Sequence, residues 1–235
     1  TTAHTLSLHD ALPIYTPIPI LGKMFRYLAS QTKTNICCHV DHGYTLDECY
    51  EGIDSGFTSV MFDGSKLTLK ENIKISKKIA SRAHKYNISI EGEIGFVGYD
   101  NGKISEGTNI EDAVSFANKS NIDAMAISVG NTHLQTSKKA SIDFNKINLI
   151  EAKTKIPLVL HGSSGIPVEQ RKKLARKTKV AKLNIGTEIR MTFGEALRKN
   201  LKNNPKTYDR LQLLKPTIKD LTKVTKKIIK QIGPN

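Results

Sequence analysis

Residues that could do chemistry stand at the ends of several short apolar runs in this sequence. The run ICCHVDHG at 36–43 ends in Asp41 and His42, and the run IPLVLHG at 156–162 ends in His161. Carboxylates transfer protons, and neutral imidazoles are common metal ligands. Comparable positions hold Asp63, Glu93, His133, Ser164, Asn184 and Thr187. Any one of these residues can be structural, but their recurrence at equivalent places indicates a shared site.

The apolar runs have the length of β-strands and alternate with amphipathic stretches of helical length. Strands are predicted at 35–40, 58–64, 88–95, 123–130, 156–162 and 181–186, and helices at 46–54, 70–86, 111–120 and 167–177. This alternation is typical of a parallel α/β sheet, either doubly wound or closed as a barrel. In a barrel the carboxyl ends of all strands meet at one rim, which would bring the polar residues together. His39 lies inside its run, so we expect it to be structural.

Length and composition point to a globular chain with a core of its own. The 235 residues suffice for one barrel-sized domain or two small ones, and 38% of them are hydrophobic. No apolar stretch reaches the roughly 20 residues of a membrane span, and the first residues do not resemble a signal peptide. Cys37, Cys38 and Cys49 lack the spacing of a structural zinc site. A cytoplasmic location is therefore expected.

The chain is strongly basic, with a formal net charge of +14 and a pI near 9.6. Such a charge raises nucleic acid and anionic membranes as partners. Much of the excess, however, lies at 171–179 and 222–230, where lysines alternate with apolar residues as on a solvated helix face. There is no tryptophan and no interleaving of aromatic and basic residues. We therefore expect a small phosphorylated substrate, and neither nucleic acid nor a membrane.

An ordered set of motifs resembles the class II, zinc-dependent ketose-bisphosphate aldolases, which include fructose-bisphosphate and tagatose-bisphosphate aldolases. The resemblance runs from about residue 22 to the C-terminal helix. It implies a TIM (β/α)8 barrel domain over 22–235, cleavage of a ketose 1,6-bisphosphate to dihydroxyacetone phosphate and glyceraldehyde 3-phosphate, and a homo-oligomer. The motifs are HVDHG (39–43), GFTSVMFDGS (56–65), ENI (71–73), IEGEIG (90–95), IDAMAISVGNTH (122–133), IPLVLHGSSGI (156–166) and AKLNIGTEI (181–189).

The resemblance also implies a role for each candidate residue. His42, His133 and His161 would bind zinc, and Asp41 would be the general acid and base at the oxygen atoms of the bond that is cleaved. Asp63 and Glu93 would hold a second metal position or support the first. The phosphate of the substrate would be bound at two turns after late strands, by Gly162, Ser164, Asn184, Gly186 and Thr187.

Two loops depart from the family pattern. Leu134 stands where the family usually has a glycine after the metal-binding histidine, beside the expected contact with a monovalent cation, Na+ or K+. The loop GYDNGKISEG at 98–107 lacks the usual double glycine followed by acidic residues. Asp100 is the nearest candidate for the carboxylate that abstracts a proton from carbon, and Glu106 is the next.

The N-terminal part is shorter than the resemblance requires. Two strand-helix units normally precede the HVDHG strand and need about 60 residues, whereas Ile36 has 35 residues before it. We therefore expect the first two units to be missing, residues 1–21 to lie outside the family domain, and His4 and His9 not to be ligands. The chain would be an N-terminally truncated enzyme, and an inert chain is one alternative to an active one. The alternatives are an aldolase for another phosphorylated keto-sugar and a basic, non-catalytic phosphate- or nucleic-acid-binding protein on the same fold.

Overall fold

The computed structural model describes residues 4–7, 16–99, 105 and 107–233, and a curved parallel sheet forms its centre. Within this described part the sheet has seven strands in the order β1-β2-β3-β4-β6-β8-β9, with β1 and β9 at its two edges. The strands are β1 (His4–Ser7), β2 (Ile36–Gly43), β3 (Ser59–Phe62), β4 (Ser89–Ile94), β6 (Ala124–Ile127), β8 (Leu158–Leu160) and β9 (Val180–Leu183).

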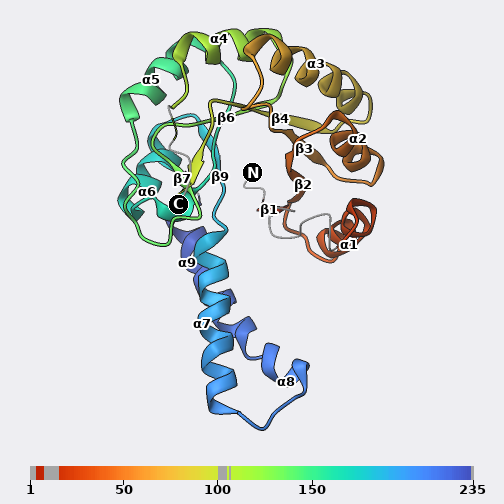
Figure 1. The fold of residues 1–235 in the computed structure, drawn as a ribbon, viewed down its shortest axis with the longest axis vertical. Coiled ribbons are helices and arrows are strands. Elements are labelled where there is room, and N and C mark those ends of the chain that lie inside the picture. The colour runs from red at the N-terminus through yellow and green to blue at the C-terminus, as the bar shows by residue number, and fades with distance from the viewer. Residues whose placement is uncertain (1–3, 8–15, 100–104, 106, 234–235) are drawn as a thin grey trace.

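Helices cover the outer, convex face of this sheet, as Figure 1 shows. They connect successive parallel strands, which confirms the predicted α/β fold of the barrel type. The covering helices are α1 (Ile18–Ser30), α2 (Leu46–Asp54), α3 (Leu69–Lys85), α4 (Ile110–Lys119), α5 (Phe144–Lys153) and α6 (Val168–Lys177). Among the described residues, no helix has the length and hydropathy needed to cross a membrane.

Three short strands were not predicted from the sequence. Strand β1 lies in the N-terminal segment to which no element was assigned, and it pairs in parallel with β2 from His4 opposite Ile36 to Ser7 opposite His39. Strands β5 (Gly98–Tyr99) and β7 (Thr132–His133) form a separate parallel pair, with Tyr99 opposite His133. Strands of two residues are too short to produce a periodic pattern, so only tertiary contacts reveal them.

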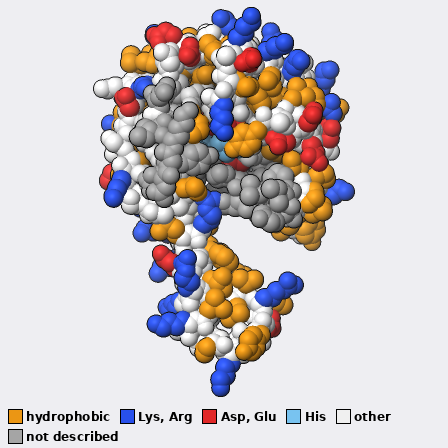
Figure 2. Space-filling view, viewed as in Figure 1, with side chains coloured by type: hydrophobic (Ala, Val, Ile, Leu, Met, Phe, Trp, Pro, Cys, Tyr) orange, Lys and Arg blue, Asp and Glu red, His pale blue; other side chains and the backbone are white. Residues whose placement is uncertain are grey.

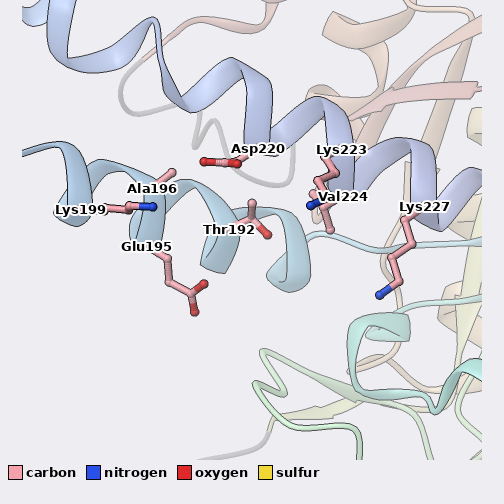
Figure 3. Close-up of a pocket in the computed structure, with 8 residues that line it drawn as sticks. All are labelled: Thr192, Glu195, Ala196, Lys199, Asp220, Lys223, Val224 and Lys227. Carbon is pink, nitrogen blue, oxygen red and sulfur yellow. The ribbon is translucent and has the colours of Figure 1, made fainter.

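The C-terminal helices form an arm that projects from the barrel-like body (Figure 1). The arm consists of α7 (Thr187–Asn203), α8 (Arg210–Leu214) and α9 (Thr217–Ile232). Apolar side chains are visible along it in Figure 2, and Leu211 and Ile218 are 68% and 60% exposed. A groove of about 380 Å³ lies between α7 and α9 and is lined by residues such as Glu195, Lys199 and Asp220 (Figure 3).

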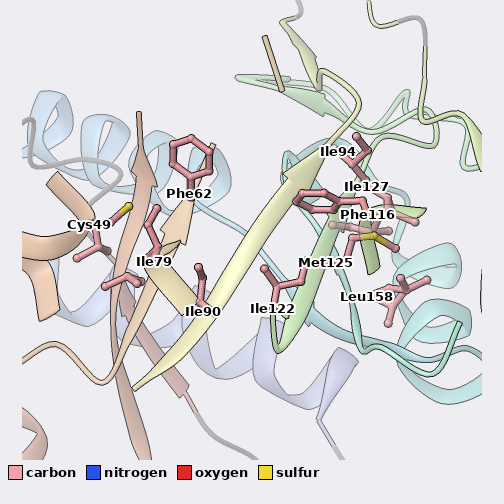
Figure 4. Close-up of a cluster of buried hydrophobic side chains, with 14 of the residues drawn as sticks. Cys49, Phe62, Ile79, Ile90, Ile94, Phe116, Ile122, Met125, Ile127 and Leu158 are labelled. Carbon is pink, nitrogen blue, oxygen red and sulfur yellow. The ribbon is translucent and has the colours of Figure 1, made fainter. Parts of the chain in front are cut away.

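Strand β4 presents apolar side chains to the core on one face of the sheet and carboxylates on the other face. Ile90 and Ile94 point into the apolar core shared with Phe116, part of which is shown in Figure 4. Gly92 lies between them, and a Cβ atom there would be 2.8 Å from the ring of Phe116, so only glycine fits. Because side chains alternate along a strand, the carboxylates of β4 point to the opposite, inner face. That inner face carries the site described next.

Candidate metal centre and active site

The three predicted metal ligands meet at one end of the sheet. His42 lies near the end of β2, His133 in β7, and His161 directly after β8. Their ring centroids are 5.3 Å (His42–His133), 4.6 Å (His42–His161) and 5.8 Å (His133–His161) apart. One nitrogen from each ring lies within 4.8 Å of the others, which is suitable spacing for ligands of a single ion. His133 and His161 are buried.

A bulge in β2 allows the side chains of both Asp41 and His42 to point toward this site. Val40 pairs with Val60 and Gly43 with Phe62, so two residues of β2 lie opposite the single residue Met61. His42 has φ +58°, in the left-handed region that most residues avoid. In a regular strand, consecutive side chains would point to opposite faces, and the bulge removes that alternation. An Oδ1 atom of Asp41 consequently lies 3.9 Å from Nδ1 of His161.

Two carboxylates adjoin His42, as predicted for Asp63 and Glu93. Nδ1 of His42 is 2.8 Å from Oδ2 of Asp63 and 3.9 Å from Oε2 of Glu93. Burial lowers the pKa of His42, but the hydrogen bond to Asp63 and the charges of Asp41 and Glu93 outweigh it and raise the pKa to about 9. Burial and the charge of Asp63 raise the pKa of Glu93 well above its ordinary value.

The site has the chemical character of a metal centre. Three imidazoles leave open positions on a bound ion, the composition of a catalytic rather than a structural zinc site. Oε2 of Glu93 is buried and has no hydrogen-bond partner among the described residues. A bare carboxylate in that position is costly, and a divalent cation would compensate its charge. His42, Asp63 and Glu93 also form a second group with ligand atoms within 4.8 Å of one another.

Asp41 is held beside the histidines by Asn184. Nδ2 of Asn184 donates to Oδ1 of Asp41 over 3.3 Å and lies 3.2 Å from Nδ1 of His161. The backbone of Asn184 is tied to the neighbouring strand through Leu160 and Ser163, at 2.9 Å each. Although burial raises the pKa of Asp41, the charges of His161, His42 and Lys182 hold it well below its usual range. The carboxylate is therefore ionised in the metal-free chain.

The two turns predicted to bind phosphate are joined to each other. Gly162 has φ +62°, and a Cβ atom there would lie 2.3 Å from the carbonyl oxygen of Thr132, so the backbone passes close to β7. Oγ of Ser164 accepts a hydrogen bond from the backbone N–H of Glu188 over 3.1 Å. Gly186 and Thr187 begin α7. The predicted residues thus surround the N-terminus of a long helix, where an anion is stabilised.

Comparison with known proteins identifies the family. The family model described as fructose-bisphosphate aldolase class-II matches residues 6–235. The chain belongs to this family. The resemblance found in the sequence is therefore confirmed, and the chain is a lyase of the aldolase type.

Curated aldolases are about one third identical to this family member over the aligned residues. The 6-phospho-5-dehydro-2-deoxy-D-gluconate aldolase of Shouchella clausii (strain KSM-K16) is 36% identical over 201 residues, covering 84% of this chain and 68% of that protein. The fructose-bisphosphate aldolase of Staphylococcus aureus (strain Mu50 / ATCC 700699) is 33% identical over 202 residues, covering 84% and 70%.

Solved structures show the same fold. The YdjI aldolase from Escherichia coli K12 superposes with a TM-score of 0.77 at 24% identity, covering 98% of this chain and 81% of that one. The fructose-bisphosphate aldolase from Campylobacter jejuni also has a TM-score of 0.77, at 18% identity, with 99% and 82% covered.

Four residues at or beside this aldolase site were missed in the sequence. Glu91, which is buried, and Lys182, which is partly exposed, form an ion pair of 2.7 Å next to His161. Arg190 donates to Oγ1 of Thr187 over 3.1 Å, at the turn expected to bind phosphate. Arg171 is fully buried and donates to Glu188 over 2.6 Å. Alternation along β4 could have revealed Glu91, because it lies two residues before Glu93 and shares its face.

Of the residues in the two loops that depart from the family pattern, the structure describes Leu134 but not the two candidate carboxylates. Leu134 has φ +56° and is half exposed, so a bulky residue occupies a conformation that favours glycine. Asp100 and Glu106 both lie outside the described residues. Tyr99, the residue before Asp100 in the chain, pairs with His133.

Proposed function

We propose that this chain catalyses the reversible, zinc-dependent aldol cleavage of a phosphorylated ketose, releasing dihydroxyacetone phosphate from the keto end. The observation that carries the proposal is the convergence of His42, His133 and His161 beside the ionised carboxylate of Asp41. The site lies at the end of the sheet where the two linked turns could hold a phosphate.

The metal would be held by the three histidines, with Asp63 and Glu93 supporting it or forming a second position. A bound Zn²⁺ polarises a carbonyl oxygen and stabilises the negative charge that develops when the carbon-carbon bond breaks. Asp63 orients His42 through their 2.8 Å hydrogen bond. The neutral imidazoles and the open positions they leave favour zinc over the hard cations, which prefer oxygen ligands.

Protons are moved by carboxylates in the proposed reaction. Asp41 accepts the proton of the substrate hydroxyl during cleavage and returns it during condensation, and Asn184 keeps its Oδ1 atom in place. Asp100 is proposed as the group that exchanges a proton with the carbon atom of dihydroxyacetone phosphate, with Glu106 as the alternative. Its chain neighbour Tyr99 supports this assignment, because Tyr99 pairs with the ligand residue His133.

The phosphate group is proposed to sit between Gly162, Ser164, Asn184, Gly186 and Thr187. The N-terminus of α7 supplies backbone N–H groups and a favourable dipole. A monovalent cation, Na+ or K+, is expected beside the loop that contains Leu134. A homo-oligomer, a dimer or a tetramer, and a cytoplasmic location complete the proposal.

The substrate is proposed to be fructose 1,6-bisphosphate or tagatose 1,6-bisphosphate, with glyceraldehyde 3-phosphate as the second product. A second candidate comes from the relatives named 6-phospho-5-dehydro-2-deoxy-D-gluconate aldolase, which reach 36% identity. That compound also carries a ketone next to a phosphorylated carbon. Breaking the bond between its carbons 3 and 4 therefore releases dihydroxyacetone phosphate as well, and the two candidates share the reaction on the keto side.

A direct assay tests the reaction and separates the substrates. The 235-residue chain is loaded with Zn²⁺, and the release of dihydroxyacetone phosphate is followed from each of the three compounds. Cleavage of at least one compound should stop on addition of a chelator and return with metal. A folded chain that shows no chelator-sensitive cleavage of any of them contradicts the proposal.

The same preparation tests the rival of a basic binding protein. On the face shown in Figure 2, Lys and Arg side chains are spread over the body and the arm among acidic and apolar ones, which does not favour a nucleic-acid surface. Binding of an oligonucleotide that weakens steeply with salt, without aldolase activity, would favour the rival.

A further inference from the structure

A buried carboxylate, Glu91, connects the proposed metal ligand His161 to the interior of the sheet. Oε1 of Glu91 is 2.8 Å from Nε2 of His161, and its Oε2 is 2.7 Å from Nζ of Lys182. Nζ of Lys182 also lies 3.1 Å from Nε2 of His39, whose Nδ1 is 2.9 Å from Oγ of Ser59. The side chains of Glu91 and His161 are only 3% and 1% exposed. These contacts therefore form a continuous network that is buried at Glu91 and His161 and partly exposed at Lys182.

The chemistry of this network defines where the proton of His161 lies. Nζ of Lys182 donates to Oε2 of Glu91, which pairs this carboxylate with an ammonium group while its Oε1 atom faces Nε2 of His161. An ionised carboxylate can only accept hydrogen bonds, so Nε2 of His161 must carry the hydrogen. The form of an imidazole that binds a metal is neutral and has a single N–H. The other nitrogen of His161, Nδ1, is then left with a lone pair.

The position of Nδ1 matches this assignment. It lies 3.9 Å from Oδ1 of Asp41, on the reacting side of the site, and 3.2 Å from Nδ2 of Asn184, which is 3.4 Å from Nε2. The backbone is held as well, because Nδ2 of Asn131 donates to the carbonyl oxygen of His161 over 3.0 Å. Both the ring and the main chain of His161 are thus fixed by groups that lie outside the ligand set.

We infer that Glu91, itself held by Lys182, is a positioning residue that locks His161 in the Nε2–H tautomer and presents Nδ1 to the metal. The inference rests on the proposed metal site. The inference adds Glu91 and Lys182 to that site, although neither residue supplies a ligand atom for the ion. Partners of this kind fix ring orientation and increase ligand basicity, and their loss typically lowers metal affinity by about 10- to 100-fold.

Substitutions at the pair can be made with little steric change. Glu91→Gln keeps the shape but offers an amide that can donate as well as accept, so the tautomer is no longer imposed. Lys182→Met removes the ammonium group that pairs with Oε2 of Glu91, and Lys182→Arg retains a positive charge there. A cavity of about 170 Å³ beside Lys182, lined also by Cys37 and Ser89, gives the longer arginine room. Lys179→Met is the matched control, because Lys179 precedes the same strand and contacts carbonyl oxygens of Glu151 and Thr154.

The test uses two measurements on the full chain. Long-range ¹⁵N–¹H correlation spectra of the metal-free protein report the tautomer of each histidine, and competition with a chromogenic chelator reports Zn²⁺ affinity. Wild type should show His161 with hydrogen on Nε2. Glu91→Gln and Lys182→Met should show mixed tautomers and about 10- to 100-fold weaker Zn²⁺ binding. Lys182→Arg should recover most of the affinity, and Lys179→Met should match wild type.

Two results would overturn the inference. One is a wild-type spectrum with hydrogen on Nδ1 of His161, which needs no variant to fold. The other is folded Glu91→Gln and Lys182→Met variants that keep wild-type affinity within about twofold, against the 10-fold or greater loss expected. Failure of the proposed function is distinguishable, because it would appear as absent Zn²⁺ binding or cleavage in wild type while the tautomer was as inferred.

Discussion

Asp41 and His42 are consecutive residues, yet both side chains contribute to one site because the bulge in β2 cancels the alternation between them. His42 adopts φ +58° there and is held by a 2.8 Å hydrogen bond to Asp63. Asp41 meanwhile faces His161 and Asn184 from the same strand end. A local irregularity thus places the proposed proton-transfer group directly beside a proposed metal ligand, and bulges are common near active sites.

The first prediction concerns metal binding. His42→Gly removes one imidazole without backbone strain, because glycine accepts φ +58°. We expect Zn²⁺ affinity to fall by at least about 100-fold, since two histidines remain of a three-histidine set. His84→Ala removes a surface histidine paired with Asp123 and serves as the control. Metal content measured after dialysis should drop for the first variant only, and equal retention by both would count against the assigned ligands.

The second prediction concerns the proton that His42 carries in the metal-free chain. In the metal-free chain the pKa of His42 is raised to about 9, above its ordinary 6.5, so the ring is protonated at neutral pH. Metal must displace that proton, and the apparent affinity should fall as pH decreases below 9, by up to about tenfold per unit. Titration calorimetry at pH 7.5 in buffers of different ionisation enthalpy should detect release of about one proton. Asp63→Asn should reduce this number, and a buffer-independent heat in wild type would refute the prediction.

The same pKa shift has a consequence for the stability of the metal-free chain. A group whose pKa is higher in the folded state stabilises that state most below its unfolded pKa. The contribution of the His42–Asp63 pair should therefore be complete below pH 6.5 and lost as pH rises through about 9. Denaturant unfolding of metal-free wild type between pH 6 and 9 should show this decline, and Asp63→Asn should show less of it.

The third prediction concerns the two turns expected to bind phosphate. Glu188 accepts from buried Arg171 over 2.6 Å and from exposed Lys138 over 3.0 Å, and Arg171 also donates to the carbonyl oxygen of Ser164. Arg171→Met should lower the free energy of unfolding by about 3 kcal/mol, since it removes the buried partner of Glu188 and leaves the carbonyl oxygen of Ser164 without this donor. Lys138→Met should cost less than about 1 kcal/mol, because that pair is partly solvated. Urea unfolding compares the two, and equal losses would show that Arg171 does not join the turns.

The fourth prediction concerns Leu134. A non-glycine residue in the left-handed region costs about 1 to 2 kcal/mol, so Leu134→Gly should stabilise the chain by about 1 kcal/mol. Asn87→Gly is the control, because Asn87 has a similar φ of +55° but asparagine tolerates this region better. A thermal shift of the leucine variant no greater than that of the asparagine variant would show that Leu134 is not strained.

Much of the site follows from the sequence by itself. The strand-length runs, their alternation with helices and the polar residues at their ends predict a parallel sheet with chemistry at one rim. His42, His133 and His161 meet as the motifs imply, although they come from distant parts of the chain. The prediction succeeds because hydrophobic periodicity and strand ends can be recognised in the local sequence. A parallel topology then brings the carboxyl ends of the strands together at one rim.

The remaining features were decided by the tertiary structure. Nothing in ICCHVDHG shows that two residues oppose Met61, and nothing local joins Glu91 to Lys182 or Arg171 to Glu188. Glu91 and Lys182 are 91 residues apart in the chain, yet the inner face of the sheet pairs the buried Glu91 with the partly exposed Lys182. Bulges and buried ion pairs depend on which strands become neighbours, and that is known only once the chain has folded.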